Sequence, residues 1–449
     1  MNNIPEYQDQ DALDIAQWID ANLGGRVTHM EKLPRWRPSW NVEAAPAGGG
    51  APLRLHVRGE RGAGLETQPL AMEMRILQIL AKNGIPVPRV YGWCGEPRAI
   101  VMDNVAGEPY QGGAETDPGM LGLVEDYVAI LADIHRLDTA PFADAGLELA
   151  DSEEDSALAY LYMAEKTWLD NRASPDPLVE FVRRWLRRNV PKGRNTRCFL
   201  VGDAPQFLYR NDTIACIYDL EMARIGDPMF DLASLRVRDT NEPTGHLARI
   251  FAHYARQSGE ALDIAAINFY SVLQFIAVPM ISGPSLRTIK PHPAFMEYLS
   301  WGLSGTRSAL EAMAEIMGVT LEPAPSLPVR PSVHDDALAD LVAQCEALPA
   351  TGGFFRQHPA LSLAFYARRV DQLGPAIEAL ELDGIAELLG TRPATIAAGE
   401  AALERHVLET GEDRDEALLR FFHRRAMARL QLLQDYPSPV VTRGLGAIT

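Results

Sequence analysis

The chain has 449 residues, of which 47% are hydrophobic and 23% charged, and its formal net charge is −18. This length is sufficient for two or three domains with sizeable cores. The acidic balance excludes nucleic acid as an expected partner, because phosphate backbones are bound by clustered Lys and Arg.

The four cysteines are Cys94, Cys198, Cys216 and Cys345, and their spacing matches neither a zinc site nor a disulfide framework. The N-terminus lacks the basic and then apolar order of a signal peptide. We also expect no apolar run long enough to cross a membrane. These features predict a cytoplasmic protein with no membrane partner.

The first hundred residues predict a helix, three strands, a second helix and two more strands. In chain order these elements are helix 11–23, strands 26–32, 40–44 and 53–58, helix 69–82, and strands 85–92 and 99–105. In the third strand, the period of two places Arg54, His56 and Arg58 on one face.

The rest of the chain is predicted to be mostly helical. Helical spacing is found in 120–134, 177–188, 246–257, 262–278 and 294–317. The Pro-rich stretch 321–332 predicts an extended linker, and 333–436 predicts a separate helical bundle. His135 ends an apolar helical face and is predicted to be a buried core residue, while Asp231 is predicted to be the N-cap of a helix.

Two aspartates, Asp203 and Asp219, each follow a short apolar run and are predicted to lie close together near one hairpin. Phosphoryl transfer to an alcohol requires one carboxylate that orients the attacking hydroxyl and another that holds magnesium. A turn aspartate is the alternative for Asp203, and a basic partner is the alternative to metal for Asp219. The phosphate-binding motif Gly-x-x-x-x-Gly-Lys-Ser/Thr and the motifs His-Glu-x-x-His and Gly-x-Ser-x-Gly are absent.

The segment Val201-Gly-Asp, followed by Ile217-Tyr-Asp-Leu-Glu and Gly226-Asp-Pro-Met-Phe-Asp-Leu-Ala, resembles the catalytic segment of the aminoglycoside phosphotransferase-like family, which includes choline kinase-like enzymes. The resemblance covers roughly residues 25–320. It implies an α+β, two-lobed protein-kinase-like fold, here with an added all-helical C-terminal domain. It also implies an ATP- and Mg²⁺-dependent phosphotransferase that acts on a hydroxyl group of a small molecule.

The same resemblance assigns roles to single residues. Asp203 corresponds to the catalytic aspartate, Asp219 to the metal-binding aspartate, and Gln206 lies nearest to the asparagine that helps to hold metal. The remaining implied contacts are with the nucleotide: Arg58 on its phosphates, Glu73 paired with that arginine, and the backbone of Met102, Asp103, Asn104 and Val105 on its adenine.

The chain departs from the family pattern at Val201, where histidine is usual, in a catalytic loop that is two residues shorter, and at Gln206. These departures motivate an alternative: a catalytically weak or inactive pseudokinase that binds a nucleotide or small ligand and acts as a binding or regulatory protein.

The predicted domains are a nucleotide-binding lobe at 1–104, a mainly helical catalytic lobe at 105–320, the linker at 321–332 and a helical accessory domain at 333–449. For the accessory domain, three alternatives stay open: a cover over the active-site cleft, a homodimer contact, or a stabilising appendage.

Overall fold

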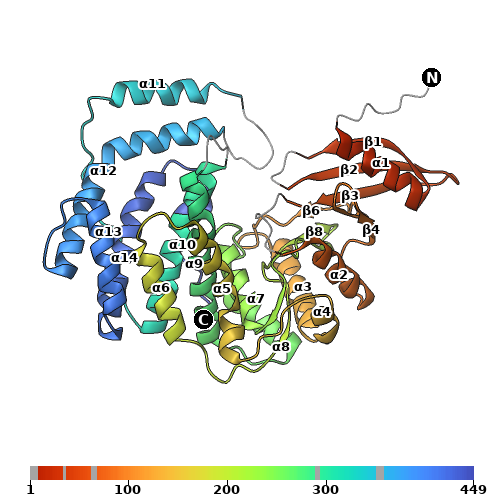
Figure 1. The fold of residues 1–449 in the computed structure, drawn as a ribbon, viewed down its shortest axis with the longest axis horizontal. Helices are drawn as coiled ribbons and strands as arrows, with labels where there is room; N and C mark the ends of the chain where they lie inside the picture. Colours follow the sequence, from red (N-terminus) through yellow and green to blue (C-terminus); the bar gives the residue numbers. More distant parts are fainter. Residues whose placement is uncertain (1–8, 34–36, 62–67, 289–293, 350–357) are drawn as a thin grey trace. The chain divides into compact units, whose positions relative to one another are not determined.

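The computed structural model describes residues 9–33, 37–61, 68–288, 294–349 and 358–449 (Figure 1). The chain forms two compact units. Unit 1 comprises Met1–Leu149, Thr196–Asp231 and Thr244–Leu262, and unit 2 comprises Ala150–Asn195, Leu232–Pro243 and Asp263–Thr449. The domain boundaries expected from the sequence stay a prediction.

Unit 1 contains an antiparallel five-stranded sheet with the strand order β1-β2-β3-β5-β4 (Figure 1). Its strands are β1 (Gly25–Lys32), β2 (Ser39–Pro46), β3 (Leu53–Gly59), β4 (Val90–Cys94) and β5 (Ala99–Asp103). Alternate residues of β2, β3 and β5 pack with Ile15 and Ile19 of α1 (Gln10–Leu23) in one apolar core. The predicted order of these elements is therefore confirmed.

The remaining elements of unit 1 carry the loops of the candidate site. The helices are α2 (Leu70–Lys82), α3 (Pro118–His135), α4 (Ala140–Asp144) and α8 (Leu247–Ser258). The short strands are β6 (Glu108–Pro109), β7 (Cys198–Leu200), β8 (Phe207–Arg210), β9 (Thr213–Ile217) and β10 (Arg224–Gly226). Strand β7 pairs with β10, and β8 pairs with β6 and β9. Helix α7 (Met229–Asp239) begins in unit 1 and ends in unit 2.

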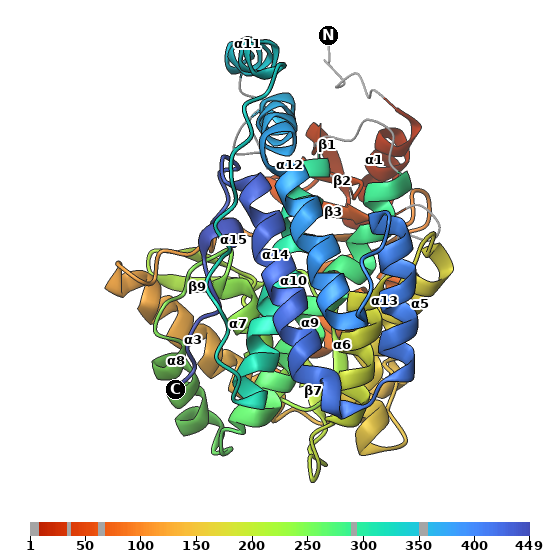
Figure 2. The same ribbon diagram turned by 90° about the vertical axis from the view of Figure 1, so that its left-hand side faces the viewer.

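Unit 2 is a bundle of helices (Figure 2). Its α-helices are α5 (Glu153–Asn171), α6 (Pro177–Arg188), α9 (Ile264–Thr288), α10 (Phe295–Met317), α11 (Asp335–Glu346), α12 (Pro359–Leu389), α13 (Ile396–Glu409), α14 (Asp415–Leu430) and α15 (Pro439–Thr442). Two short 3₁₀ turns, η1 (Glu412–Arg414) and η2 (Gln431–Leu433), flank α14. The Pro-rich stretch 321–332 contains no helix or strand, and its role as a linker stays a prediction.

The expectation that no apolar run reaches the length of a membrane span was wrong. The stretch Ile264–Gly283 of α9 is long and apolar enough, but 72% of its most apolar window is buried inside the structure. Helix α9 packs against α5, α6 and α10. A helix that is surrounded by other helices is apolar on every side, which explains the composition of this one.

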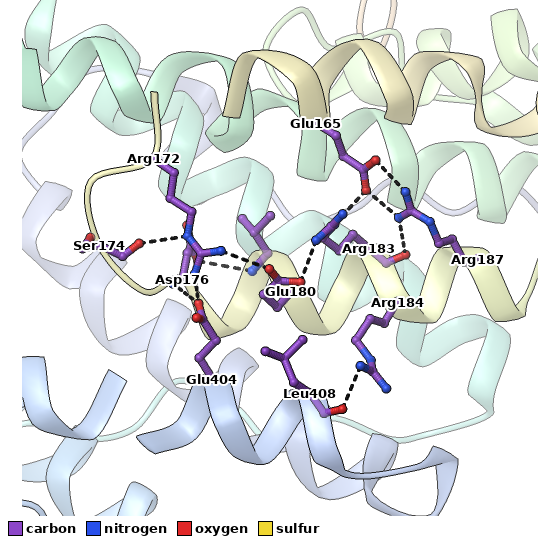
Figure 3. Close-up of polar contacts among 11 residues, drawn as sticks. Glu165, Arg172, Ser174, Asp176, Glu180, Arg183, Arg184, Arg187, Glu404 and Leu408 are labelled. Carbon is purple, nitrogen blue, oxygen red and sulfur yellow. Dashed lines mark hydrogen bonds and ion pairs between the residues drawn. The ribbon is translucent and has the colours of Figure 1, made fainter. Parts of the chain in front are cut away.

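Ion pairs tie α13 to α6 and α6 to α5 within unit 2 (Figure 3). Arg183 of α6 donates to Glu165 of α5 at 2.7 Å and to Glu180 at 2.8 Å. Arg172 reaches Glu180 at 3.1 Å and also pairs with Glu404 of α13. These carboxylates are largely buried, so removing one partner would leave an uncompensated charge inside the unit.

The stability of unit 2 is expected to fall in acid because of His423 on α14. Burial, together with the nearby charge of Arg307, lowers the pKa of His423 to about 4 from 6.5. The folded state therefore binds fewer protons than the unfolded state between these two pH values, and stability is lost as the pH falls through this window. The loss amounts to about 3 kcal/mol.

Urea unfolding at several pH values between 4 and 7 would measure this loss. The variant His423→Leu should show a flatter decline than the wild type. The exposed His29 serves as the control, and His29→Gln should keep the wild-type slope. An unchanged slope in His423→Leu would contradict the assignment.

Candidate functional site

Asp203 and Asp219 lie in two loops of unit 1 that touch each other. Asp203 follows β7 and Asp219 follows β9. The N–H of Tyr218 donates to the carbonyl of Gln206 at 3.2 Å, which joins the two loops. A Cβ on Gly202 would lie 2.1 Å from the carbonyl oxygen of Met222, so only glycine fits at this approach. The structure thus brings together the two loops that carry the predicted carboxylates.

The loop before Asp203 is held by the buried carboxylate of Asp231, which is 0% exposed. Asp231 accepts hydrogen bonds from the N–H groups of Val201 at 2.8 Å and Gly202 at 2.9 Å. It is not an N-cap, as was predicted, because α7 already begins at Met229. Asp227 accepts from the N–H of Met229 at 3.0 Å instead, which frees Asp231 to bind the loop.

His135 supports this anchor, and its side chain is only 5% exposed, in agreement with the predicted core position. Its Nε2 lies 3.1 Å from Asp231, and its Nδ1 lies 2.7 Å from the hydroxyl of Tyr254. Val201, which stands where the family has histidine, is buried and contributes its backbone N–H to the anchor. The backbone of the shortened loop is therefore fixed without that histidine.

Gln206 lies beside Asp203, because its side-chain nitrogen donates to the Asp203 carboxylate at 2.8 Å. This bond holds one carboxylate oxygen in place and directs the amide nitrogen of Gln206 toward Asp203. The amide oxygen is the atom that would serve a metal ion. The role of Gln206 as a metal ligand stays a prediction.

Arg58 forms ion pairs with two other predicted site residues. Its guanidinium lies 2.6 Å from Asp219 and 3.1 Å from Glu73, and the Glu73 side chain is only 4% exposed. Asp219 adopts a left-handed backbone with φ of 62°, a conformation that aspartate tolerates better than most residues. Glu73 therefore forms a buried ion pair and does not lie at an exposed edge of α2.

Two further arginines that the sequence did not point to converge on the same place. Arg37 and Arg61 donate to Glu221 at 2.7 and 2.6 Å, and Arg58 reaches the same carboxylate at 3.4 Å. Glu221 follows Asp219 by two residues, so three guanidinium groups surround the loop that carries Asp219. Such a cluster suits phosphate groups, which guanidinium binds in a bidentate manner.

Burial and the neighbouring charges shift the pKa values in this cluster. Burial opposes the charge on Arg58, but the carboxylates of Glu73, Asp219 and Glu221 outweigh it, so the pKa of Arg58 is raised. Burial also raises the pKa of Glu73, and the charge of Arg58 offsets only part of that effect. The pKa of Arg61 is lowered by burial, and the charge of Arg37 lowers it further. The ion pair with Arg58 therefore compensates only part of the cost of burying the Glu73 carboxylate.

The segment predicted to receive adenine, residues 102–105, comprises the last two residues of β5 and the two residues after it. The N–H of Asp103 donates to the carbonyl of Arg89 at 2.9 Å, and that of Asn104 donates to the carbonyl of Arg54 at 3.0 Å. Met102 is buried in the sheet. Within the part of the chain that the structure describes, the N–H of Val105 forms no hydrogen bond, which leaves it available for a ligand.

The oxygen atoms of these loops suit a magnesium ion that the protein shares with a bound ligand. They do not suit an ion that the protein holds alone. Among the described residues, no three His, Cys, Asp or Glu side chains gather into a metal site. Magnesium is commonly held by one or two carboxylates, with phosphates and water as its other ligands. Asp219 would supply one such carboxylate, in a loop that is joined to the loop of Gln206.

Comparison with known proteins gives a family match over part of the chain. Residues 48–266 match the phosphotransferase enzyme family. A segment of 239 residues is 22% identical to acyl-CoA dehydrogenase family member 11 of Rattus norvegicus and covers 47% of this chain. The chain spans only 30% of the length of that relative.

A solved structure shows the same fold. A proposed aminoglycoside phosphotransferase from Ralstonia eutropha has a TM-score of 0.54 at 14% identity, and the match covers 69% of this chain and 98% of that one. A macrolide 2′-phosphotransferase from Brachybacterium faecium has a TM-score of 0.48 at 17% identity, over 65% of this chain and 97% of that one. The predicted α+β kinase-like fold with an added helical C-terminal region is therefore confirmed, as is the resemblance to the aminoglycoside phosphotransferase-like family.

Proposed function

Because residues 48–266 match the phosphotransferase enzyme family, we propose that this chain transfers the γ-phosphate of ATP to a hydroxyl group of a small molecule. The observation that carries this proposal is the meeting of two loops in unit 1. One loop presents Asp203, and the other presents Asp219 against Arg58. Catalysis of this transfer consists mainly of positioning and charge stabilisation, for which these residue types are suited.

In the proposed mechanism, Asp203 accepts a hydrogen bond from the attacking hydroxyl and aims it in line with the phosphate. Gln206 holds the Asp203 carboxylate in one orientation through its 2.8 Å hydrogen bond. Arg58 binds phosphate oxygens, and Glu73 keeps the guanidinium in place from behind. Magnesium, when bound at Asp219, would neutralise charge on the phosphates.

Arg37 and Arg61 extend this phosphate site in the proposal. Both now donate to Glu221, which Arg58 also reaches. The acceptor is a small alcohol, and its identity does not follow from these residues, because acceptor contacts in such folds are made by variable parts of the chain.

Calorimetry with ATP in the presence and absence of magnesium tests the proposal. We expect ATP to bind more tightly with magnesium than without it. In the variant Asp219→Asn, the affinity for ATP in the presence of magnesium should fall at least about tenfold. Asparagine also tolerates a left-handed backbone, so the fold should survive the change. Full magnesium-dependent affinity in Asp219→Asn would remove this residue from the metal site.

The alternative is a pseudokinase that binds the nucleotide without transferring phosphate. Val201 and the Gln206 amide, which donates to Asp203, motivate it. Nucleotide binding without turnover across a broad panel of alcohols would favour this alternative.

A further inference from the structure

A cavity of about 310 Å³ lies within unit 2 beside α12 and α14. Its floor includes the buried residues Gly384, Phe421 and His423, and Glu387 and Arg424 are exposed at its rim. We call it the α12–α14 cavity. This volume is at the lower end of the range of small-molecule sites, so it suits a small ligand.

The cavity holds one arginine whose charge is uncompensated. Arg420 pairs with Glu416 at 2.7 Å, and Arg424 lies 3.9 Å from Glu387. Arg414, in contrast, forms no ion pair among the described residues. Its buried Nε has no hydrogen-bond partner there, and its Nη2 reaches only the carbonyl of Leu388 at 3.5 Å. A half-buried guanidinium in this state favours an anion beside it.

His423 adds a second donor. It is 5% exposed, and its side chain forms no hydrogen bond within the described ranges. Burial, with the charge of Arg307, lowers the pKa of His423 to about 4, so the imidazole is neutral at pH 7 and offers one N–H group. A buried polar group of this kind is stabilised by an acceptor.

Apolar side chains make up much of the remaining wall, among them Leu321, Leu380 and Phe421. An occupant therefore needs an apolar part as well as an acceptor. The exposed carboxylates of Glu322 and Glu387 also line the cavity, and they disfavour a ligand with two negative charges.

We propose that the α12–α14 cavity binds a small monocarboxylate with an aliphatic chain, whose carboxylate pairs with Arg414 and accepts a hydrogen bond from His423. One uncompensated cation calls for one negative charge, and the leucine and phenylalanine side chains cover the aliphatic part. The site is separate from the proposed phosphotransfer chemistry, and its test does not depend on that activity.

Calorimetry of the full chain with octanoate at pH 7 tests the proposal. We expect saturable binding of one octanoate per chain, and binding at least about tenfold weaker for octanamide, which lacks the charge, and for octyl phosphate, which carries up to two. Absence of octanoate binding, or equal binding of either analogue, would overturn the proposal.

Two variants locate the site. Arg414→Met removes the positive charge that would pair with the carboxylate, and His423→Phe removes the N–H donor on the floor of the cavity. Each variant should weaken octanoate binding at least about tenfold. The matched control is Arg392→Met, which removes an arginine that pairs with Asp383 at 2.7 Å and does not line the cavity. Wild-type affinity in both cavity variants would show that octanoate binds elsewhere.

Discussion

Replacing Asp203 by alanine is expected to lower kcat by at least about 100-fold while ATP affinity stays nearly unchanged. The carboxylate orients the attacking hydroxyl in the proposed mechanism and does not contact the nucleotide. The backbone of the loop is held by Asp231 through Val201 and Gly202, so the loop should keep its place without this side chain. Steady-state rates with the best acceptor, together with calorimetry of ATP binding, would measure both effects.

Asp212 provides the matched control for Asp203. It is an exposed aspartate in the turn between β8 and β9, and Asp212→Ala should keep wild-type turnover. Gln206→Leu should lower kcat by an intermediate factor. It removes the hydrogen bond that orients Asp203, but the Asp203 carboxylate itself remains. Equal rates for the wild type and Asp203→Ala would remove the aspartate from the mechanism.

The variant Arg58→Met should lose about 3–5 kcal/mol of unfolding free energy in unit 1. Glu73 is almost fully buried, and its guanidinium partner at 3.1 Å is what compensates its charge. Without Arg58, burial and the charges of Asp219 and Glu221 raise the pKa of Glu73 further, and the charge of Arg37 opposes them only in part. The loss should therefore be larger at pH 8 than at pH 5, where Glu73 is more readily protonated.

Arg54, on the same strand and the same face, is the control for Arg58. Its side chain is 69% exposed and lies 3.7 Å from Glu43, so Arg54→Met should cost no more than about 1 kcal/mol. The double variant Arg58→Met with Glu73→Gln should recover part of the stability, because the buried charge is gone. Urea unfolding would measure all three variants, and equal losses for Arg54→Met and Arg58→Met would contradict the account.

The site residues predicted from the sequence came from local patterns and from the resemblance to a known family. Strand alternation placed Arg58 on one face with Arg54 and His56, and apolar runs placed Asp203 and Asp219 after short strands. The convergence of Arg37 on Glu221 could not be predicted in this way, because 184 residues separate them and no local pattern links them.

The wrong expectations have physical causes as well. Asp231 resembles an N-cap in the sequence, but Asp227 takes the capping role and the helix begins before Asp231. The length of the apolar run in α9 was underestimated. The run is long because this helix is mostly buried within a large bundle of helices. Helix α5 was not predicted, because buried charges such as Glu165, which pairs with Arg183, interrupt its apolar face.

The most direct test of the proposed phosphotransfer is to incubate the full chain with ATP, magnesium and a broad panel of small alcohols, and to follow the products by ³¹P nuclear magnetic resonance. We predict a new phosphate monoester signal that requires magnesium and that disappears, within the time of the assay, in Asp203→Ala. Magnesium-dependent ATP binding with no monoester from any alcohol would contradict the proposed phosphotransferase and favour the pseudokinase.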